Sequence, residues 1–386
     1  MSAGPSTDIS RGRYLVQAGD CQACHTTAGG QLFAGGRAVP TPFGTIYSTN
    51  ITPDPDTGIG KWSEADFYRA MHTGVRRDGK HLYPAFPYPW FTKISMSDAR
   101  AIKAWLDTLP PVRQLNRPIA LPWPLSVRSA MAVWNDMYFD EGTYRYDSQR
   151  SAQWNRGAYL AQGLGHCSAC HGDKNLAGAV DKKHPLSGGF AEHVYAPNLD
   201  GNVRDGLGGW SEQEIVDYLG GGHNANSAAA GPMAEVVTDS TQYLTEPDRR
   251  AIAVYLKSLP AGKEARLASA SADVMRRGGA LYTDNCEGCH LRAGTGEAGA
   301  FPRLQGSAAI QAAEPDTLIA VILQGAKVPA THTDQTALAM PAFADKLDDA
   351  EVAALTSYIR QAWGNRADAV STDKVSDLRK TLHQSP

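Results

Sequence analysis

The sequence predicts an all-α protein built from three tandem domains of similar size. Its 386 residues correspond to about two to three domains of the usual length. The pattern Cys-x-x-Cys-His occurs three times, and each copy follows a segment with helical spacing of apolar residues. Gly- and Pro-rich stretches with almost no strand pattern lie between the helices. We place the domains at residues 8–112, 151–262 and 270–366, with a linker strap at 113–150 and a C-terminal tail at 367–386.

Each domain is expected to repeat the same order of helices. The second helix of the first two domains follows Trp62-Ser63-Glu64 and Trp210-Ser211-Glu212, where serine is a natural N-cap and an acidic residue favours the first turn. The other helices are expected at 11–20, 155–165 and 276–285 before the cysteine motifs, at 314–323 as the third copy of the second helix, and at 97–106, 246–256 and 348–359 as closing helices.

The two junctions between the domains differ in composition. The strap contains Pro118, Pro122 and Pro124 and the apolar stretch Met131-Ala-Val-Trp134, which predicts an ordered segment rather than a flexible tether. The junction at 260–272 is rich in Ala, Ser and Lys, which indicates a looser connector or a short helix.

The composition is that of an ordinary globular protein, with 42% hydrophobic residues, 20% charged residues and a formal net charge of -3. This near-neutral balance gives no reason to expect a nucleic-acid partner. The longest apolar runs, such as Thr317–Leu323, are far shorter than the roughly 18 residues that cross a bilayer. We therefore expect at most a peripheral association with a membrane.

The three cysteine motifs predict covalent haem. Two cysteines three positions apart present their sulfurs on one side of a helical turn, and the adjacent histidine can ligate the iron. A redox pair or half of a zinc site uses Cys-x-x-Cys without this histidine, and no cysteine lies outside the motifs to complete a zinc site or a disulfide. We expect three haem c groups, whose buried faces also replace the core that such long loops lack. The attachment residues are Cys21, Cys24, Cys167, Cys170, Cys286 and Cys289, and the iron ligands are His25, His171 and His290.

Covalent haem attachment also predicts the compartment, because it takes place outside the bacterial cytoplasm. The first ten residues lack the basic and apolar regions of a secretory signal. We therefore expect an exported, periplasmic protein whose signal peptide is absent from this numbering, with peripheral attachment to the inner membrane as an option.

An electron-transferring haem normally has a sixth protein ligand, and a methionine sulfur raises its reduction potential. In the third domain, Met340 lies in the loop just before the closing helix, where the distal ligand is expected. Met233 occupies the corresponding loop of the second domain. A lone methionine is usually core filler, but the repeated position favours both as iron ligands.

The first domain departs from this pattern, because Phe86 stands where a methionine is expected and a phenyl ring cannot coordinate iron. Met71, in the last turn of the second helix, is the preferred substitute. Met96, His81 and His72 are alternatives, and an open sixth position would permit small-molecule binding or peroxide chemistry.

The motifs resemble those of the three-haem cytochrome c subunits of bacterial periplasmic dehydrogenases, which include alcohol, gluconate, fructose and aldehyde dehydrogenases. Ser48–Gly60 followed by Trp62-Ser63 is similar to the signature loop of their first haem domain, and Asn155–His171 to that of their second. The likeness covers residues 11–363 and implies three tandem cytochrome c-type domains. The family's ligand pattern matches His25, His171, His290, Met233 and Met340, and it does not match Phe86.

The resemblance also implies partners. Such subunits accept electrons from a catalytic chain with flavin, pyrroloquinoline quinone or molybdenum, with a small iron–sulfur subunit as a further candidate, and pass them to quinone or another acceptor. Ala70-Met71-His72 together with Ala85–Tyr88 looks more like the cytochromes that accompany molybdenum hydroxylases. Many relatives end in an amphipathic anchor, whereas Val375, Leu378 and Leu382 form only a short apolar stripe here.

The leading functional hypothesis is therefore an electron-transfer subunit without catalytic residues of its own. Two alternatives belong to other classes: a free periplasmic multihaem carrier, and a peroxidase-like enzyme with an open first haem. Co-purification with a catalytic chain distinguishes the first two, and the sixth ligand of the first haem tests the third.

Overall fold

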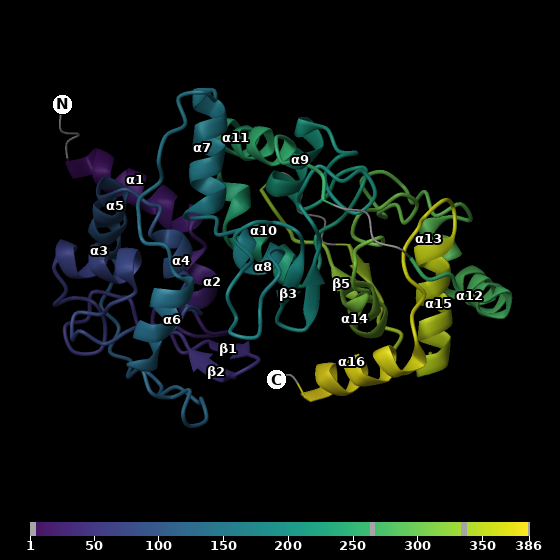
Figure 1. Cartoon of the computed structure of the whole chain (residues 1–386), viewed down its shortest axis with the longest axis horizontal. Helices are drawn as coiled ribbons and strands as arrows, with labels where there is room; N and C mark the ends of the chain where they lie inside the picture. Colours follow the sequence, from purple (N-terminus) through teal and green to yellow (C-terminus); the bar gives the residue numbers. More distant parts are fainter. Residues whose placement is uncertain (1–4, 263–266, 333–337, 385–386) are drawn as a thin grey trace. The chain divides into compact units, whose positions relative to one another are not determined.

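A computed structural model describes residues 5–262, 267–332 and 338–384 (Figure 1). Its residues group into two compact units, the first made of Met1–His166 with Asp239–Asp248 and the second of Cys167–Thr238 with Arg249–Pro386. The expected domain at 151–262 thus contributes to both units.

The first unit contains short helices, one hairpin and the long strap. The hairpin pairs β1 with β2 as antiparallel strands. The elements are α1 (Pro5–Ala18), α2 (Cys21–His25), β1 (Ala38–Thr41), β2 (Gly44–Tyr47), α3 (Glu64–Thr73), α4 (Tyr88–Phe91), α5 (Met96–Leu106), α6 (Ala130–Tyr138), α7 (Ala152–Gln162) and the 3₁₀ helix Thr241–Tyr243.

The second unit repeats this plan with two hairpins, β3–β4 and β5–β6, both antiparallel. Helices α10 and α11 each contain a boundary between the two units. The elements are α8 (Ser168–His171), β3 (Gly189–Ala191), β4 (Val194–Ala196), α9 (Glu212–Gly221), α10 (Pro232–Asp239), α11 (Glu246–Lys257), α12 (Ala272–Asn285), α13 (Glu287–His290), α14 (Asp316–Gln324), β5 (Ala326–Lys327), β6 (Ala339–Met340), α15 (Asp349–Gln361) and α16 (Thr372–Gln384).

Helices precede the cysteine motifs and close the repeats, as the sequence predicts. The expected N-caps are present: Ser63 accepts a hydrogen bond from the backbone N–H of Asp66 before α3, and Ser211 does the same from Glu214 before α9. Both are capping boxes, because the acidic side chain also accepts from the backbone N–H of its serine. The three hairpins were not predicted, since strands of two to four residues leave too short an alternation to detect.

Close packing of the first helix on the closing helix is visible in both units. In the first unit, α1 packs on α5, and a Cβ added at Gly12 would lie 1.9 Å from the carbonyl oxygen of Ala101. In the second, α12 packs on α15, and a Cβ at Gly278 would lie 2.2 Å from the carbonyl oxygen of Ala354. Only glycine lets the two backbones approach this closely.

An ion pair joins the same two helices in equivalent places. Arg11 contacts Asp98 at 2.5 Å in the first unit, and Arg277 contacts Glu351 at 3.6 Å in the second. Each arginine directly precedes the glycine at the helix crossing, and each acidic residue lies in the first turn of the closing helix. This shared geometry supports the internal repeat inferred from the sequence.

The strap is ordered and carries one helix, α6. Its earlier part pairs with the first hairpin through an antiparallel bridge between Ala120 and Thr45. The junction at 260–272 is not helical in its described residues before α12, and 263–266 lie outside them.

The C-terminal segment forms α16 and belongs to the hydrophobic core of the second unit. Val375 and Leu378 are buried in a cluster with residues of α12, α14 and α15, and Leu382 packs against it. The apolar stripe of this helix therefore faces the protein interior.

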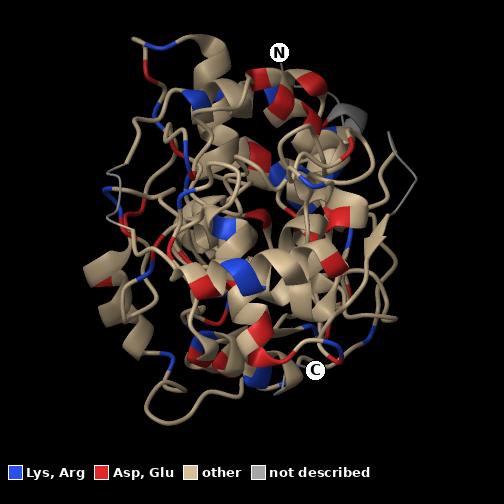
Figure 2. Cartoon of the chain, turned by 90° about the vertical axis from the view of Figure 1, so that its right-hand side faces the viewer, with Lys and Arg blue, Asp and Glu red and all other residues tan. Residues whose placement is uncertain are grey.

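No helix in the described part of the chain has the length and apolar character needed to span a membrane. Figure 2 shows Lys and Arg interspersed with Asp and Glu along the ribbon.

Candidate haem sites

The three motif histidines share one hydrogen-bonding arrangement. Nδ1 of His25 lies 2.6 Å from the carbonyl oxygen of Thr49, Nδ1 of His171 lies 2.7 Å from that of Pro197, and Nδ1 of His290 lies 2.9 Å from that of Pro302. A carbonyl oxygen can only accept, so Nδ1 carries the proton in each ring. Nε2 is then the unprotonated nitrogen, and the ring is oriented as an iron ligand requires.

A glycine fixes the backbone of each histidine in the same way. The amide groups of Gly35, Gly188 and Gly296 donate to the carbonyl oxygens of the three histidines at 2.7, 2.9 and 3.0 Å. All three glycines have left-handed backbone angles, with φ of 76°, 89° and 61°. Sequence reasoning missed them because their distance from the motif histidine differs in every repeat. The only signal was that each motif is followed by a glycine-containing loop.

Burial keeps the three imidazoles neutral. It lowers the pKa of each motif histidine, and the hydrogen bond to the backbone carbonyl opposes the shift only in part. A neutral imidazole is the form that binds a metal. The sites therefore present ligands that need no proton removal at physiological pH.

The six motif cysteines all lie in the described residues, and no disulfide joins them. Burial raises the pKa of Cys21 to about 12 and the pKa values of Cys167 and Cys286 to about 11. These three sulfurs are therefore buried thiols of low reactivity. Among the described residues no group of three or more His, Cys, Asp or Glu side chains is placed to hold a metal ion. Thioether attachment of haem to the six cysteines stays a prediction from the three sequence motifs.

The two methionines expected as distal ligands both precede the closing helices, but they were expected in loops, whereas the structure places Met340 in a short strand and Met233 in a helix. Met340 ends β6 and packs against the hydrophobic cluster that contains Cys286, so the structure brings it into the same core as the third motif. Met233 is half-buried in the first turn of α10, shortly after Gly231 with φ of 54°.

In the first unit the candidate distal ligands differ in burial. Met71 is 4% exposed in the last turn of α3, whereas Met96, the first residue of α5, is 46% exposed. The ring of Phe86, at the expected methionine position, packs edge-on against Phe91 at 5.5 Å between centroids.

The two histidine alternatives have different surroundings. His72 stacks on Tyr68 at 4.8 Å between ring centroids, and its Nε2 lies 3.6 Å from Glu141. Nδ1 of His81 is buried and has no hydrogen-bond partner among the described residues. Its carbonyl oxygen accepts a hydrogen bond from Arg128. Of the two histidines, His81 is therefore the one whose ring nitrogen is available to bind a further group.

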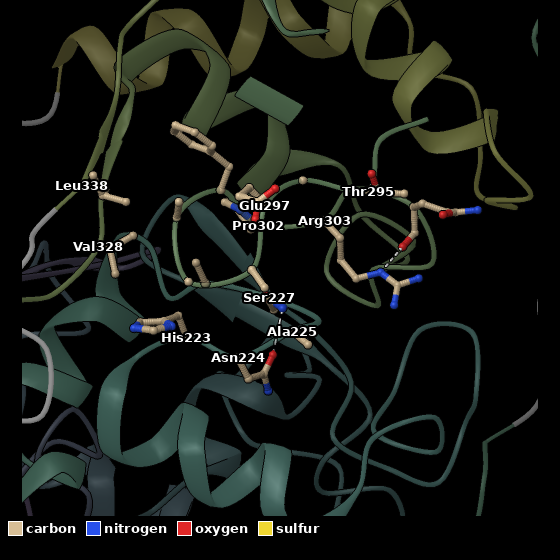
Figure 3. A pocket seen from close by; sticks show the side chains of 17 residues that line it. His223, Asn224, Ala225, Ser227, Thr295, Glu297, Pro302, Arg303, Val328 and Leu338 are labelled. Carbon is tan, nitrogen blue, oxygen red and sulfur yellow. Dashed lines mark hydrogen bonds between the residues drawn. The ribbon is translucent and has the colours of Figure 1, made fainter. Parts of the chain in front are cut away.

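A cavity of about 400 Å³ opens in the second unit beside the third motif (Figure 3). One wall consists of 295–305, which includes the Gly296 and Pro302 that bond to His290. The facing wall comes from 223–228, just before Met233, and Val328 lies on the rim. The second and third expected domains therefore share a surface next to a candidate haem site.

The sequence was also compared with known protein families and with known proteins. The family model for cytochrome c matches residues 155–260 and 275–363. These two segments contain the second and third motifs with Met233 and Met340.

Three relatives are similar over almost the whole chain. One of the subunits of nicotinate dehydrogenase from Pseudomonas putida is 44% identical over 91% of the chain, which spans only 30% of that relative's length. The gluconate 2-dehydrogenase cytochrome c subunit of Pantoea cypripedii is 41% identical over 96% of the chain and 89% of its own length. The cytochrome c subunit of alcohol dehydrogenase (quinone) from Gluconobacter oxydans is 39% identical over 97% of the chain and 82% of its own length.

Proposed function

The chain belongs to the cytochrome c family, and from that premise we propose that it is a three-haem electron-transfer subunit of a dehydrogenase complex. It receives electrons from a catalytic chain and passes them to quinone or another respiratory acceptor. One observation carries the haem count: all three motif histidines, including His25 outside the matched segments, donate Nδ1–H to a backbone carbonyl and leave Nε2 free for iron.

The motif residues are proposed to bind haem and to fix its orientation. The two cysteines of each motif would hold a porphyrin through thioether bonds, and the motif histidine would ligate its iron. Bound haem supplies a reversible one-electron couple. Met233 and Met340 are proposed as sixth ligands, and their sulfurs hold the potentials of the second and third haems high. The chain's contribution is therefore the position, burial and ligation of three redox centres.

Met71 is proposed as the sixth ligand of the first haem. Its side chain is buried in the helix that precedes the distal loop, whereas the exposure of Met96 disfavours that residue. His81 is the second candidate because its buried Nδ1 lacks a hydrogen bond among the described residues. Histidine ligation would give a lower potential than methionine ligation.

The partner is proposed to be a catalytic dehydrogenase chain, since the similar proteins are named as subunits of such enzymes. The resemblance of Ala70-Met71-His72 and Ala85–Tyr88 to the cytochromes that accompany molybdenum hydroxylases favours a molybdenum-type partner over a flavin or pyrroloquinoline quinone type. A small iron–sulfur subunit is expected in the complex only if the partner is of this type, so its presence tests the assignment. The periplasm is the proposed location, because covalent haem is attached there.

The experiment is substrate-driven reduction of the haems. The tagged holoprotein is purified from its own organism, and its α-band absorbance is followed after addition of alcohols, aldehydes, sugar acids or N-heterocycles. We expect one substrate class to reduce the haems and a soluble quinone to reoxidise them. A holoprotein that co-purifies with no dehydrogenase and is reduced by no substrate would instead be a free carrier.

A further inference from the structure

The strap presents an apolar side that covers no core. Helix α6 has the sequence Ala-Met-Ala-Val-Trp-Asn-Asp-Met-Tyr, yet none of its residues is buried. Val133 and Met137, one helical turn apart, are 63% and 61% exposed. A helix this apolar normally buries one face against its own protein. Its exposed face therefore needs another partner.

The segment before α6 extends the same character. Trp123 is 83% exposed and Leu115 is 82% exposed, and Leu125 and Val127 are also exposed. Between residues 118 and 135 the only charged side chain is Arg128. We define the strap face as Leu115, Trp123, Leu125, Val127, Val133 and Met137.

The strap is held firmly on its other side, so this exposure does not come from a loose segment. Asn135 of α6 accepts a hydrogen bond from the hydroxyl of Tyr88 at 2.5 Å. The carbonyl oxygen of Leu125 accepts one from the hydroxyl of Tyr83 at 2.9 Å. Arg128 donates to the carbonyl oxygen of His81 at 2.9 Å, and its guanidinium lies over the Tyr83 ring. These contacts fix the strap to the distal loop that contains Phe86.

The size of the strap face suits a permanent interface. Six side chains with these exposed fractions together expose on the order of 600 Å² along the strap. A stable protein–protein interface takes about 800 Å² from each partner, and its centre is poor in charge. The strap face supplies most of that centre.

Resting on the proposed function, we propose that the strap face is the docking surface for the catalytic dehydrogenase chain. The distal loop of the first haem lies directly under the strap, so a chain docked there places its redox centre on the side of that haem. In the 44% identical relative, the matched region makes up 30% of one chain named as a dehydrogenase subunit. A cytochrome region joined to so much further sequence has a permanent neighbour, as an apolar docking surface requires. The first haem is then the entry point for electrons.

The test compares two pairs of charge substitutions in the full holoprotein. Val133→Glu with Met137→Glu alters the strap face, and Leu176→Glu with Val203→Glu is the matched control, since those two residues belong to the second unit and are 100% and 75% exposed. The milder pair Val133→Ser with Met137→Ser guards against a folding defect. Haem content and thermal unfolding are measured for each variant before purification of the complex.

We expect the strap variants to keep their haem content and to lose at least tenfold in recovered catalytic chain and in the rate of substrate-driven haem reduction, while the control pair behaves as wild type. Equal recovery by wild type and both strap pairs would overturn the docking proposal and leave the proposed function standing. Loss of self-association, or of binding to anionic lipid vesicles, with unchanged recovery of the catalytic chain would also overturn it. A wild-type holoprotein that recovers no dehydrogenase would overturn the proposed function itself.

Discussion

The hydroxyl of Tyr14 in α1 donates a hydrogen bond to Asp248 at 2.5 Å, although the two residues are 234 positions apart. Asp248 also accepts two hydrogen bonds from Arg156, at 2.6 and 2.8 Å. An equivalent arrangement occurs at Tyr159 of α7, whose hydroxyl donates a hydrogen bond to Asp98. Asp98 also forms an ion pair with Arg11. In each of the first two repeats, the tyrosine of the first helix thus bonds to an aspartate in the closing helix of the other repeat. This exchange of partners ties the segment 239–248 to α1.

Tyr14→Phe is expected to destabilise the first unit by about 1–3 kcal/mol, because it removes a hydrogen bond to a charged, largely buried carboxylate. The measurement is chemical unfolding of the holoprotein followed by circular dichroism, taking the first transition. Tyr146→Phe is the control, since Tyr146 is exposed. Equal stability of the two variants would show that the Tyr14 bond has no net effect.

Asp248 makes the stability of this unit depend on pH. Burial alone would raise the pKa of Asp248, but the hydrogen bonds from Arg156 and Tyr14 outweigh burial and hold it below its usual range. A lowered folded-state pKa stabilises the protein fully above the unfolded value of about 3.9, and this stability disappears as the pH falls through the folded value. Asp248→Asn should therefore be less stable than wild type at pH 7, with the difference shrinking below about pH 4. Asp284→Asn serves as the control, because Asp284 is exposed. A stability difference between wild type and Asp248→Asn that grew in acid would contradict the lowered pKa of Asp248.

Gly35→Ala is expected to disturb the ligation of the first haem. A Cβ there would lie 2.4 Å from the carbonyl carbon of Thr49, whose oxygen accepts from Nδ1 of His25. Gly29→Ala is a matched control, because Gly29 also has positive φ but no atom within 4 Å of its added Cβ. Magnetic circular dichroism should show a changed first-haem signature in Gly35→Ala alone. The same change in both variants would point to backbone strain rather than to the Thr49 contact.

The sixth ligand of the first haem is tested by Met71→Ala beside His81→Ala. Redox titration followed by magnetic circular dichroism should show loss of one histidine–methionine signature in Met71→Ala and none in His81→Ala. Loss in His81→Ala alone would transfer the ligand role to His81. Three unchanged signatures in both variants would remove both residues from the ligand set.

Local signals account for what the sequence predicted well. The serine caps at Ser63 and Ser211 and the periodicity of the closing helices depend on neighbouring residues, and the structure confirms them. The bond between Tyr14 and Asp248 joins different repeats, so no local pattern contains it. Gly35, with its two counterparts, escaped detection because the loops after the motifs differ in length.

Burial shows what the apolar stripe at 375–382 contacts, which the sequence left open. The stripe of Val375 and Leu378 is compatible with either a membrane surface or a protein core, since both accept apolar side chains. The structure shows that α16 packs on the core of the second unit.

The central claim is that each of the three motifs carries one covalent haem, and intact-protein mass spectrometry of the purified chain tests it most directly. We predict a mass equal to the polypeptide plus three haems, falling by one haem when Cys21 and Cys24 are both replaced by alanine. A wild-type mass with two haems or fewer, or an unchanged mass in that variant, would contradict the account.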